Sequence, residues 1–497
     1  MKAIDIDNSR TVALCLMLFA VLLYLVSFWN GWTLDDFPVI VENPDIRGVG
    51  AFFRDSYSGR PLREVSYLLD YALFGLSPVG YHVQNIFWHG LNGVLSYAVV
   101  LEVGGRPRVA VTSALLFLAH PLAVEVVANT SHRKDSLALA CMLSALLVFN
   151  RAVRQKQRRT LNVVLGLGAL VLGLLAKQNV AVFPFFLGVF LLLGTSRVEA
   201  LSRKVLAVVA VGLSLAAGGI YGILLSVNSE RFFAIAIPVF TKMNKTLLEG
   251  DFSSYLAMVA KSVGFMAGKL FWPYPLAVEY AYTAPSSWWD VSVWCGITVL
   301  ALLLAGVVLA HGRSRLAGLA CLWLLMAWVP VSNLWPFSYF AADRYMYTPL
   351  VGFAILVALF ADQLLKRRQV YLSVVAVLMM IWGGLTIQQV RVWKSPESLW
   401  LHALQVNPES TTVLNNVGAV YLGKNELAKA RVYFEKATVN MNDPLSFYNL
   451  GEVEERLGRR EQALRSYRFF LMFNDPRYQP KMDRLRMRLF RQYGVRM

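Results

Sequence analysis

Long apolar runs recur along this chain of 497 residues and restrict its possible folds more than any other feature. Most are roughly 17–23 residues long, enough for a helix to cross a hydrocarbon core about 30 Å thick. Only 16% of the residues are charged, whereas a soluble domain has roughly 25%. The sequence therefore predicts an all-α, polytopic membrane helical bundle. About eleven spans are expected, at 11–29, 82–101, 109–127, 136–150, 161–176, 180–194, 205–227, 291–310, 316–335, 345–361 and 370–388.

The basic residues favour one orientation of these spans. The connections at 151–159, 196–204, 311–315 and 366–368 are rich in Lys and Arg, and all fall on one side if the amino terminus is cytoplasmic. The net charge of +17 is therefore interpreted as membrane topology and not as nucleic-acid binding. The opposite face is then periplasmic if the membrane is a bacterial inner membrane, or lumenal if it is the ER membrane of a eukaryote.

Two segments on that opposite face do not resemble simple spans. Within the first loop, 31–80, apolar residues recur at helical spacing between charges, which favours amphipathic helices lying in the membrane interface. Within the second large loop, 228–289, the run 255–272 carries Lys261 and Lys269. We expect that run to be an interfacial or re-entrant helix.

The composition changes to that of soluble helices near residue 395. Small and aromatic residues then recur at about 33 residues, the pattern of tetratricopeptide repeats. The equivalent pairs are Gly418 and Gly451, Ala430 and Ala463, Phe434 and Tyr467, and Ala437 and Phe470. We therefore divide the chain into a membrane domain, 1–394, and a tetratricopeptide α-solenoid, 395–497. The alternative for the repeats is a packing or oligomerisation module.

Two adjacent carboxylates, Asp35 and Asp36, follow the first apolar run within the stretch WTLDDFPVIVEN, 32–43. An ionisable group at this depth is costly unless it meets water or a ligand, so the pair is a candidate functional site. The alternative is a solvated loop that begins with two acids.

Polar side chains also gather where the second span begins. His82, Asn85 and His89 share one helix face, and Arg60 precedes them in the first loop. A polar stripe on a membrane helix points into the protein, either toward a functional site or toward hydrogen bonds with other helices. The spacing leaves both interpretations open.

Three short connections on the same face bring further charges. The turn 120–135 contains His120, Glu125, Arg133 and Asp135. Lys177 lies in the next such turn, and the last contains Arg344 and Tyr345. Cations that converge opposite a pair of aspartates suit an anion at the membrane surface, such as a lipid-linked phosphate.

These motifs, taken in order, resemble the transmembrane and tetratricopeptide-repeat O-mannosyltransferases of the GT-C glycosyltransferase superfamily. The pieces are LDD, then GRPL and GYH, then HP and HRKD, then AK, then DRYMY, followed by the repeats. This chain has Gln178 where the family usually has an acid, and His132–Asp135 where the family has Gly-Arg-x-Asp. The short repeat array resembles a bacterial relative.

The resemblance implies an inverting transfer of a sugar from a polyprenyl-phosphate donor to an acceptor hydroxyl. Asp35 is then the general base with Asp36 orienting it, and the donor phosphate is bound by Lys177 and Arg344 with Arg133 and His120. The supporting polar cluster is Arg60, His82, Asn85, His89, Glu125, Asp135 and Tyr345. We expect no required cofactor and no metal, because cations already neutralise the phosphate, although two neighbouring carboxylates suit a divalent ion.

The implied partners are membrane lipid, the lipid-linked sugar and an acceptor protein held by the repeats. A GT-C enzyme that modifies a glycolipid or transfers an oligosaccharide is one alternative. A non-catalytic membrane scaffold whose repeats recruit other proteins is another. A transporter is disfavoured, because the sequence has no inverted repeat and no pair of interrupted spans.

Overall fold

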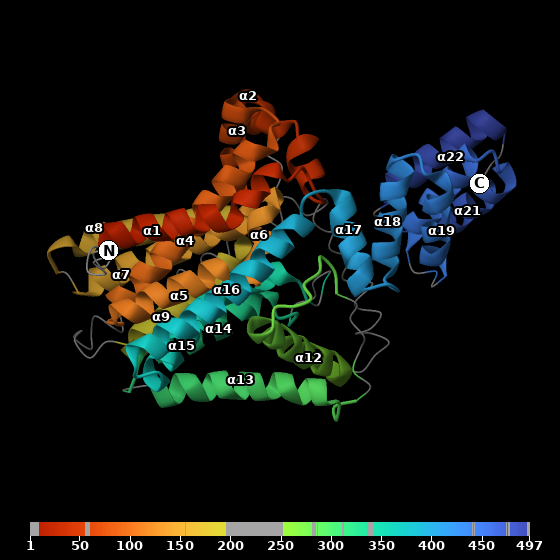
Figure 1. The fold of residues 1–497 in the computed structure, drawn as a ribbon. Helices are drawn as coiled ribbons and strands as arrows, with labels where there is room; N and C mark the ends of the chain where they lie inside the picture. The colour runs from red at the N-terminus through yellow and green to blue at the C-terminus, as the bar shows by residue number, and fades with distance from the viewer. Residues whose placement is uncertain are drawn as a thin grey trace.

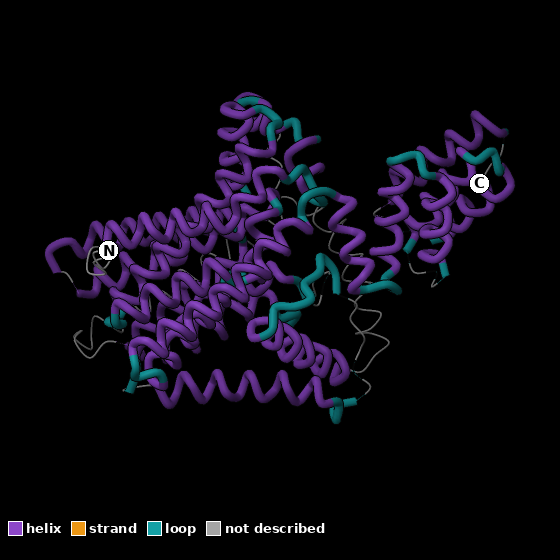
Figure 2. The backbone as a smooth tube through the Cα atoms, in the orientation of Figure 1, coloured by secondary structure: helices purple, strands orange, loops and turns teal. Residues whose placement is uncertain are grey.

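The computed structural model of the chain is built from helices (Figures 1 and 2). It describes residues 9–54, 60–154, 156–194, 252–280, 285, 287–310, 313–334, 339, 341–439, 441, 443–473, 475 and 478–494. No strand occurs among these residues, and a helix pairs its own backbone groups, as a hydrocarbon environment requires. The predicted all-α membrane helical bundle is confirmed.

The membrane bundle has an amino-terminal and a carboxy-terminal group of helices. The first group is α1 (Ser9–Tyr24), α4 (Pro78–Glu102), α5 (Pro107–Ala119), α6 (Val124–Ala128), α7 (Arg133–Arg154), α8 (Arg159–Ala176) and α9 (Phe183–Gly194). The second group is α12 (Phe252–Phe271), α13 (Val291–Ala310), α14 (Arg315–Trp328), α15 (Pro349–Leu364) and α16 (Arg368–Val392). Figure 1 shows the first loop and the carboxy-terminal helices gathered beyond the same end of the bundle.

Close contact between helices depends on glycine in this bundle, as two positions illustrate. A Cβ on Gly296 of α13 would lie 1.7 Å from the carbonyl oxygen of Ala260 on α12. A Cβ on Gly93 of α4 would lie 2.8 Å from the side chain of Leu118 on α5. Small residues at such crossings allow membrane helices to pack through van der Waals contact.

Five described helical segments are long and apolar enough to cross a membrane. They are 9–29, 130–153, 159–176, 291–310 and 368–392. A sixth arises if α5 and the segment Pro121–Ala128, which are bent by 56°, count as one span, and shorter apolar helices occupy Gln178–Phe190, Arg315–Val331 and Pro349–Leu364. The predicted span at 205–227 lies outside the described residues, so the expected count of about eleven stays a prediction.

The first loop forms α2 (Val49–Arg54) and α3 (Pro61–Phe74), as the helical spacing predicts. Helix α3 buries its charged residues, including Glu64 and Asp70, and exposes Leu69 and Leu73, at 57% and 70%. A helix with charges inside and leucines outside suits a lipid surface, where the apolar side is the favoured outer face. Its interfacial position stays a prediction.

The carboxy-terminal helices pack side by side as consecutive pairs (Figure 1). They are α17 (Pro396–Val406), α18 (Thr411–Gly423), α19 (Leu427–Thr438), α20 (Pro444–Arg456), α21 (Arg460–Met472) and α22 (Gln479–Tyr493). A Cβ on Gly418 would lie 2.7 Å from the Phe434 ring, and one on Gly451 would lie 2.5 Å from the Tyr467 ring. The residues paired by the sequence spacing thus occupy matching places. Their assignment to the tetratricopeptide class and the boundary at 395 stay predictions.

Candidate functional site

The two aspartates of the first loop have different environments. Asp36 is fully buried, and its two carboxylate oxygens accept hydrogen bonds from the backbone amides of Thr33, at 2.9 Å, and Ser131, at 2.7 Å. Burial raises the pKa of Asp36 to about 6, against the lowering effect of these hydrogen bonds. Asp35 is exposed. Asp36 therefore ties the loop to the 129–132 turn, and Asp35 is the carboxylate that faces outward.

The backbone that precedes Asp35 is held by hydrogen bonds to the end of α16. Leu34, the preceding residue, has a φ of 47°, a left-handed conformation that is unfavourable for a residue with a branched side chain. The Gly31 amide donates to the carbonyl of Lys394, at 2.9 Å, and the Asn30 side chain donates to that of Val390, at 3.0 Å. These contacts join the loop to the end of α16 and fix the position from which Asp35 projects.

Arg344 is held by the carboxylate of Glu125. Its guanidinium Nη1 donates to Glu125 Oε1, at 2.5 Å, and its backbone amide donates to Oε2, at 2.8 Å. Burial lowers the pKa of Arg344, but the Glu125 carboxylate outweighs burial and raises that pKa above its ordinary value. Arg344 is therefore a permanent cation in a fixed position, with 18% of its side chain exposed.

Lys177 forms an ion pair with Asp135 at the start of α7. Two further cations, Lys134 and Arg60, interact electrostatically with this pair. Lys134 is almost completely buried, whereas 16% of the Lys177 side chain is exposed. The turn after α8 and the start of α7 thus bring several cations together around one carboxylate.

Lys177 and Arg344 line the same cavity, which we call the polar cavity and which measures about 380 Å³ when the space open to solvent is included. Asp135, Asn179 and Thr348 add polar groups to its wall. Apolar residues from α7, α14 and the segment that follows α14 complete the lining. Two side chains from distant turns therefore point into one small, partly apolar space, where a cation interacts with an anion more strongly than in water.

Asp35 interacts electrostatically with one residue near Asp135 and with one residue near Arg344. Its charge acts on Arg60, which interacts in turn with Asp135, and on Tyr339. The guanidinium of Arg344 lies over the Tyr339 ring, 5.3 Å from its centroid. The charge of Asp35 therefore acts on two side chains, Arg60 and Tyr339, that in turn interact with Asp135 and Arg344.

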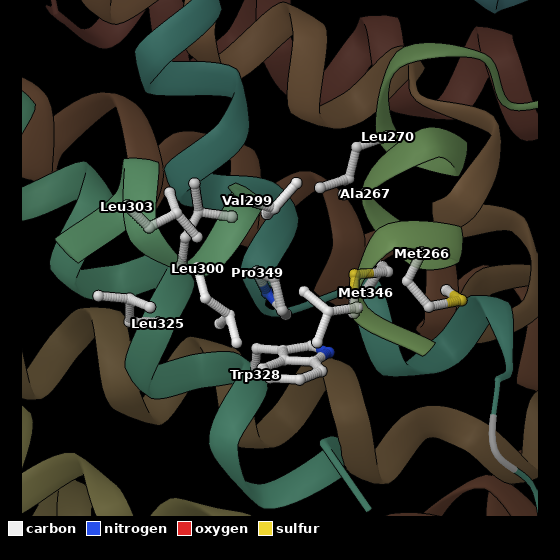
Figure 3. A pocket seen from close by; sticks show the side chains of 12 residues that line it. Met266, Ala267, Leu270, Val299, Leu300, Leu303, Leu325, Trp328, Met346 and Pro349 are labelled. Atoms are coloured by element: carbon white, nitrogen blue, oxygen red, sulfur yellow. The ribbon is translucent and has the colours of Figure 1, made fainter. Parts of the chain in front are cut away.

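A second cavity is apolar and measures about 360 Å³ when the space open to solvent is included (Figure 3). Met266 and Leu270 of α12, Leu300 of α13, and Trp328 and Met346 are among the residues that line it. Met346 follows Arg344 by two positions, and α14 contributes to the walls of both cavities. None of its lining residues is charged, so this space suits a hydrocarbon chain.

Arg133 is not placed at the polar cavity. Its guanidinium is completely buried and pairs with Asp70 Oδ2, at 2.5 Å, while also donating to Asn85 Oδ1, at 2.8 Å, and to the carbonyl of Tyr81, at 3.0 Å. Removing one partner of such a pair leaves an uncompensated buried charge and costs about 3–5 kcal/mol. We therefore reassign Arg133 from phosphate binding to holding the first loop against α4.

His120 is likewise occupied elsewhere. Its Nδ1 accepts from the backbone amide of Leu122, at 3.2 Å, and its Nε2 lies 2.9 Å from the carbonyl oxygen of Leu270. The ring is fully buried and packs against Trp382 of α16. His120 therefore stabilises the bend after α5, and we reassign it from the donor site to the fold.

The polar stripe on α4 bonds to neighbouring helices and turns. Asn85 donates to the backbone carbonyls of Val127 and Asn129, and His89 pairs with the Tyr347 hydroxyl, at 3.0 Å. His82 is fully buried on the same face. Of the two interpretations of the stripe, helix–helix hydrogen bonding fits these contacts. The rest of the supporting polar cluster, Arg60, Glu125, Asp135 and Tyr345, lies at the site, and Tyr345 lines the polar cavity.

The sequence placed Lys134 in the 120–135 turn without giving it a role, and it did not select Tyr339. Lys134 interacts electrostatically with Lys177 and Asp135, and the Arg344 guanidinium lies 5.3 Å from the centroid of the Tyr339 ring. The HRKD motif signals two adjacent cations, but neighbouring positions on a helix differ by about 100° in direction. Spacing alone therefore could not decide whether Arg133 or Lys134 faces the cavity.

Asp35 and Asp36 do not form a joint carboxylate site, because one faces outward and the other has both oxygens bonded to amides. In the described part of the chain, no group of three or more His, Cys, Asp or Glu could hold a metal ion. The expectation that no metal is required stays a prediction.

The fold and these side chains define a multi-pass helical membrane protein with a cavity lined by Lys177 and Arg344 and an exposed carboxylate, Asp35, in the first loop. The comparisons with known proteins agree with this class. A family model described as dolichyl-phosphate-mannose-protein mannosyltransferase matches residues 68–221. The chain is homologous to the protein O-mannosyl-transferases of the TMTC group, as its motifs indicated.

Three of these relatives illustrate the extent of the similarity. Protein O-mannosyl-transferase Tmtc3 of Drosophila melanogaster is 23% identical over 91% of this chain and 58% of the relative. TMTC3 of Mus musculus is 25% identical over 88% of this chain and 53% of the relative, and TMTC4 of Homo sapiens is 25% identical over 83% and 64%. The chain thus spans little more than half the length of these relatives. No solved structure matches it.

Proposed function

We propose that this chain is an inverting hexosyltransferase that moves a sugar from a polyprenyl-phosphate donor to a hydroxyl of an acceptor protein. The observation that carries the proposal is the convergence of Lys177 and Arg344 on one cavity, together with the electrostatic interaction of the exposed Asp35 with Tyr339, the ring over which Arg344 lies. The names of the relatives, which are protein O-mannosyl-transferases, support a protein acceptor.

The donor phosphate binds in the polar cavity. Lys177 and Arg344 line that space, Arg60 interacts electrostatically with Asp135, and each of the acids Asp135 and Glu125 already has a cation paired with it. The remaining positive potential favours a phosphate and stabilises the negative charge that grows as the anomeric C–O bond breaks. A phosphate is a good leaving group, so the reaction needs these cations more than it needs a strong acid.

The apolar cavity accepts the first part of the polyprenyl chain. Its walls come from α12, α13, α14 and the segment that begins at Met346, two residues after Arg344 of the polar cavity. Burial of apolar surface contributes about 25 cal/mol per Å², so a hydrocarbon chain placed there adds affinity without orienting the sugar. The charged residues then determine where the reacting atoms lie.

Asp35 acts as the general base toward the acceptor hydroxyl. It is exposed, it lies beside the cationic site, and its backbone is fixed by the bonds of Gly31 and Asn30. A positioned base contributes typically about 10²–10⁴-fold to the rate. One base and one direct displacement invert the anomeric configuration, so no covalent intermediate and no metal are required.

The transfer assay tests this proposal. The purified chain is incubated with a labelled polyprenyl-phosphate mannose and, in parallel, with a denatured protein mixture, a serine- and threonine-rich peptide and a glycolipid. We expect label on the protein and the peptide, in the inverted configuration. Label on the glycolipid alone would favour the glycolipid alternative, and no transfer to any acceptor would favour the scaffold.

The carboxy-terminal helices are proposed to present the acceptor protein. Removing residues 440–497, which keeps α17–α19, is expected to lower transfer to a protein about tenfold and to change transfer to a small peptide by less than twofold. The reason is that a groove of paired helices binds extended chain, whereas the reacting hydroxyl needs only the membrane domain. Initial rates with both acceptors measure the difference. An equal loss with both acceptors would instead indicate a packing module.

The proposed location is a bacterial inner membrane, with the amino terminus cytoplasmic and the site periplasmic. This orientation places the Lys- and Arg-rich connections on the cytoplasmic side. The first loop and the carboxy-terminal helices then share the periplasmic face, in keeping with their common position in Figure 1.

A further inference from the structure

The segment 276–280 joins the carboxy-terminal helices to the membrane domain. His402 Nε2 on α17 lies 2.8 Å from the carbonyl oxygen of Leu276. The Ser410 hydroxyl donates to Glu279 Oε1, at 3.1 Å, and the Asn407 amide donates to the Glu279 carbonyl. This segment is therefore hydrogen-bonded along its length to α17 and to the start of α18.

The carboxy-terminal helices α17–α22, which we call the helical array, also contact the loop that carries Asp35, the proposed general base. The contact is made by α17 and α18. Leu34 and Val278 both pack against one apolar cluster on α17 and α18. The cluster consists of Trp400, Ala403, Val413 and Val417. Because Leu34 precedes Asp35, the array supports the aspartate loop and the segment 276–280 at once.

Tyr280 links this segment to the phosphate-binding cations. Its hydroxyl donates to Asp343 Oδ1, at 2.5 Å, and accepts from the Ala277 amide, at 3.3 Å. Asp343 is 3% exposed and directly precedes Arg344. An unbroken series of contacts thus runs from α17 through 276–280 and Asp343 to the guanidinium that lines the polar cavity.

We propose that Tyr280 is a positioning residue for the transfer reaction, through which the docked helical array sets the place of Arg344 in the polar cavity. This inference rests on the proposed function, since it concerns the same donor site. Tyr280 itself does not line either cavity. It acts by holding Asp343, whose backbone is continuous with that of Arg344.

The surroundings of Asp343 explain why the hydroxyl matters. The groups that act on its carboxyl are Tyr280, Lys269, Glu125 and Arg344. Burial raises the pKa of Asp343 well above its usual range, and the nearby Glu125 adds to this rise. A buried carboxyl that loses a donor costs about 1–3 kcal/mol unless another donor replaces it. The charged donors near this carboxyl are Lys269 and Arg344. For either of them to replace the lost hydroxyl, the 343–344 turn has to move.

The test compares two full-length variants that lose the same group. Tyr280→Phe removes the hydroxyl that bonds Asp343, and Tyr371→Phe removes a buried hydroxyl that bonds Thr112, at 2.8 Å, between α16 and α5. Tyr280→Phe is expected to raise the KM for the donor about tenfold, or about 1.4 kcal/mol, and to leave the KM for the peptide acceptor unchanged. Tyr371→Phe is expected to match the wild type in both. Equal donor KM values in the two variants would overturn the proposal.

A double-mutant cycle tests the connection to the array. His402→Ala alone is expected to raise the donor KM about threefold, because it frees one end of the 276–280 segment. Combined with Tyr280→Phe, it is expected to add nothing further, since both changes interrupt the same series of contacts. Fully additive effects would overturn the role of the array.

Binding of decaprenyl phosphate, followed by the thermal stability of the full chain in detergent, separates this inference from the proposed function. If the wild type transfers no sugar but Tyr280→Phe weakens decaprenyl phosphate binding about tenfold, the proposed function fails and the positioning role stands. If the wild type transfers sugar and Tyr280→Phe binds and reacts like the wild type, the positioning role alone fails.

Discussion

Replacing Asp35 by asparagine is expected to lower kcat for sugar transfer by about 10²–10⁴-fold while leaving the donor KM unchanged. The amide keeps the size of the side chain but cannot accept the proton of the attacking hydroxyl. Asp35 is exposed and neither of its carboxylate oxygens supports the fold in the way those of Asp36 do, so the thermal stability should not change. Initial rates with the purified chain and a peptide acceptor measure the effect.

Two matched variants serve as controls for this result. Glu42→Gln changes another exposed acid of the same loop in the same way and should retain full activity. Asp36→Asn should lower the thermal stability, because an amide presents only one oxygen to the two backbone donors of Thr33 and Ser131. One donor left unpaired costs about 1–3 kcal/mol. Full activity of Asp35→Asn would remove the assignment of the base.

Removing either cation of the polar cavity is expected to raise the donor KM about 10–100-fold. A hydrogen bond to a charged group contributes about 1.5–3 kcal/mol, and Lys177→Ala or Arg344→Ala loses that contact with the phosphate. The Lys177→Arg variant should recover part of the affinity, because it keeps the charge. Donor binding and steady-state rates, measured at two salt concentrations, test the prediction. An unchanged donor KM in both alanine variants would contradict the phosphate site.

Both cations pair with buried acids, so removing either cation is also expected to lower the stability of the protein. Arg344→Ala leaves the Glu125 carboxylate, 2% exposed, without its cation. The double variant Arg344→Ala with Glu125→Gln should therefore recover stability but not donor affinity. Arg106→Ala is the control at a distant ion pair. Arg106 is 70% exposed and pairs with Asp362, so its loss should leave the donor KM unchanged.

The helical array shows how much of the fold sequence spacing could predict. Gly418 and Gly451 are equivalent in the sequence, and in the structure each lies against the aromatic residue that the spacing assigned to it. This prediction is local, because it depends on two helices joined by a short turn. The docking of α17 on the 276–280 segment has no such local signal, since polar contacts between distant segments leave no periodicity.

The site was predictable only in part, for a related reason. The turns that carry Lys177 and Arg344 were expected to meet on one face, because both follow apolar runs of suitable length. Spacing could not show that the buried Arg133 pairs with Asp70 or that Asp36 bonds two backbone amides. Those partners come from segments far apart in the chain, and the choice among nearby cations depends on helix rotation.

By itself, the amino-acid sequence determined that this chain is a helical membrane protein, and it predicted basic connections on one side and polar, charged turns on the other. Apolar length and charge distribution act residue by residue, so they can be read without coordinates. Only the tertiary structure decided which carboxylate faces outward, which cations share the polar cavity and which segment connects the array to Arg344. These choices depend on packing between distant segments, where a buried charge must find a specific partner.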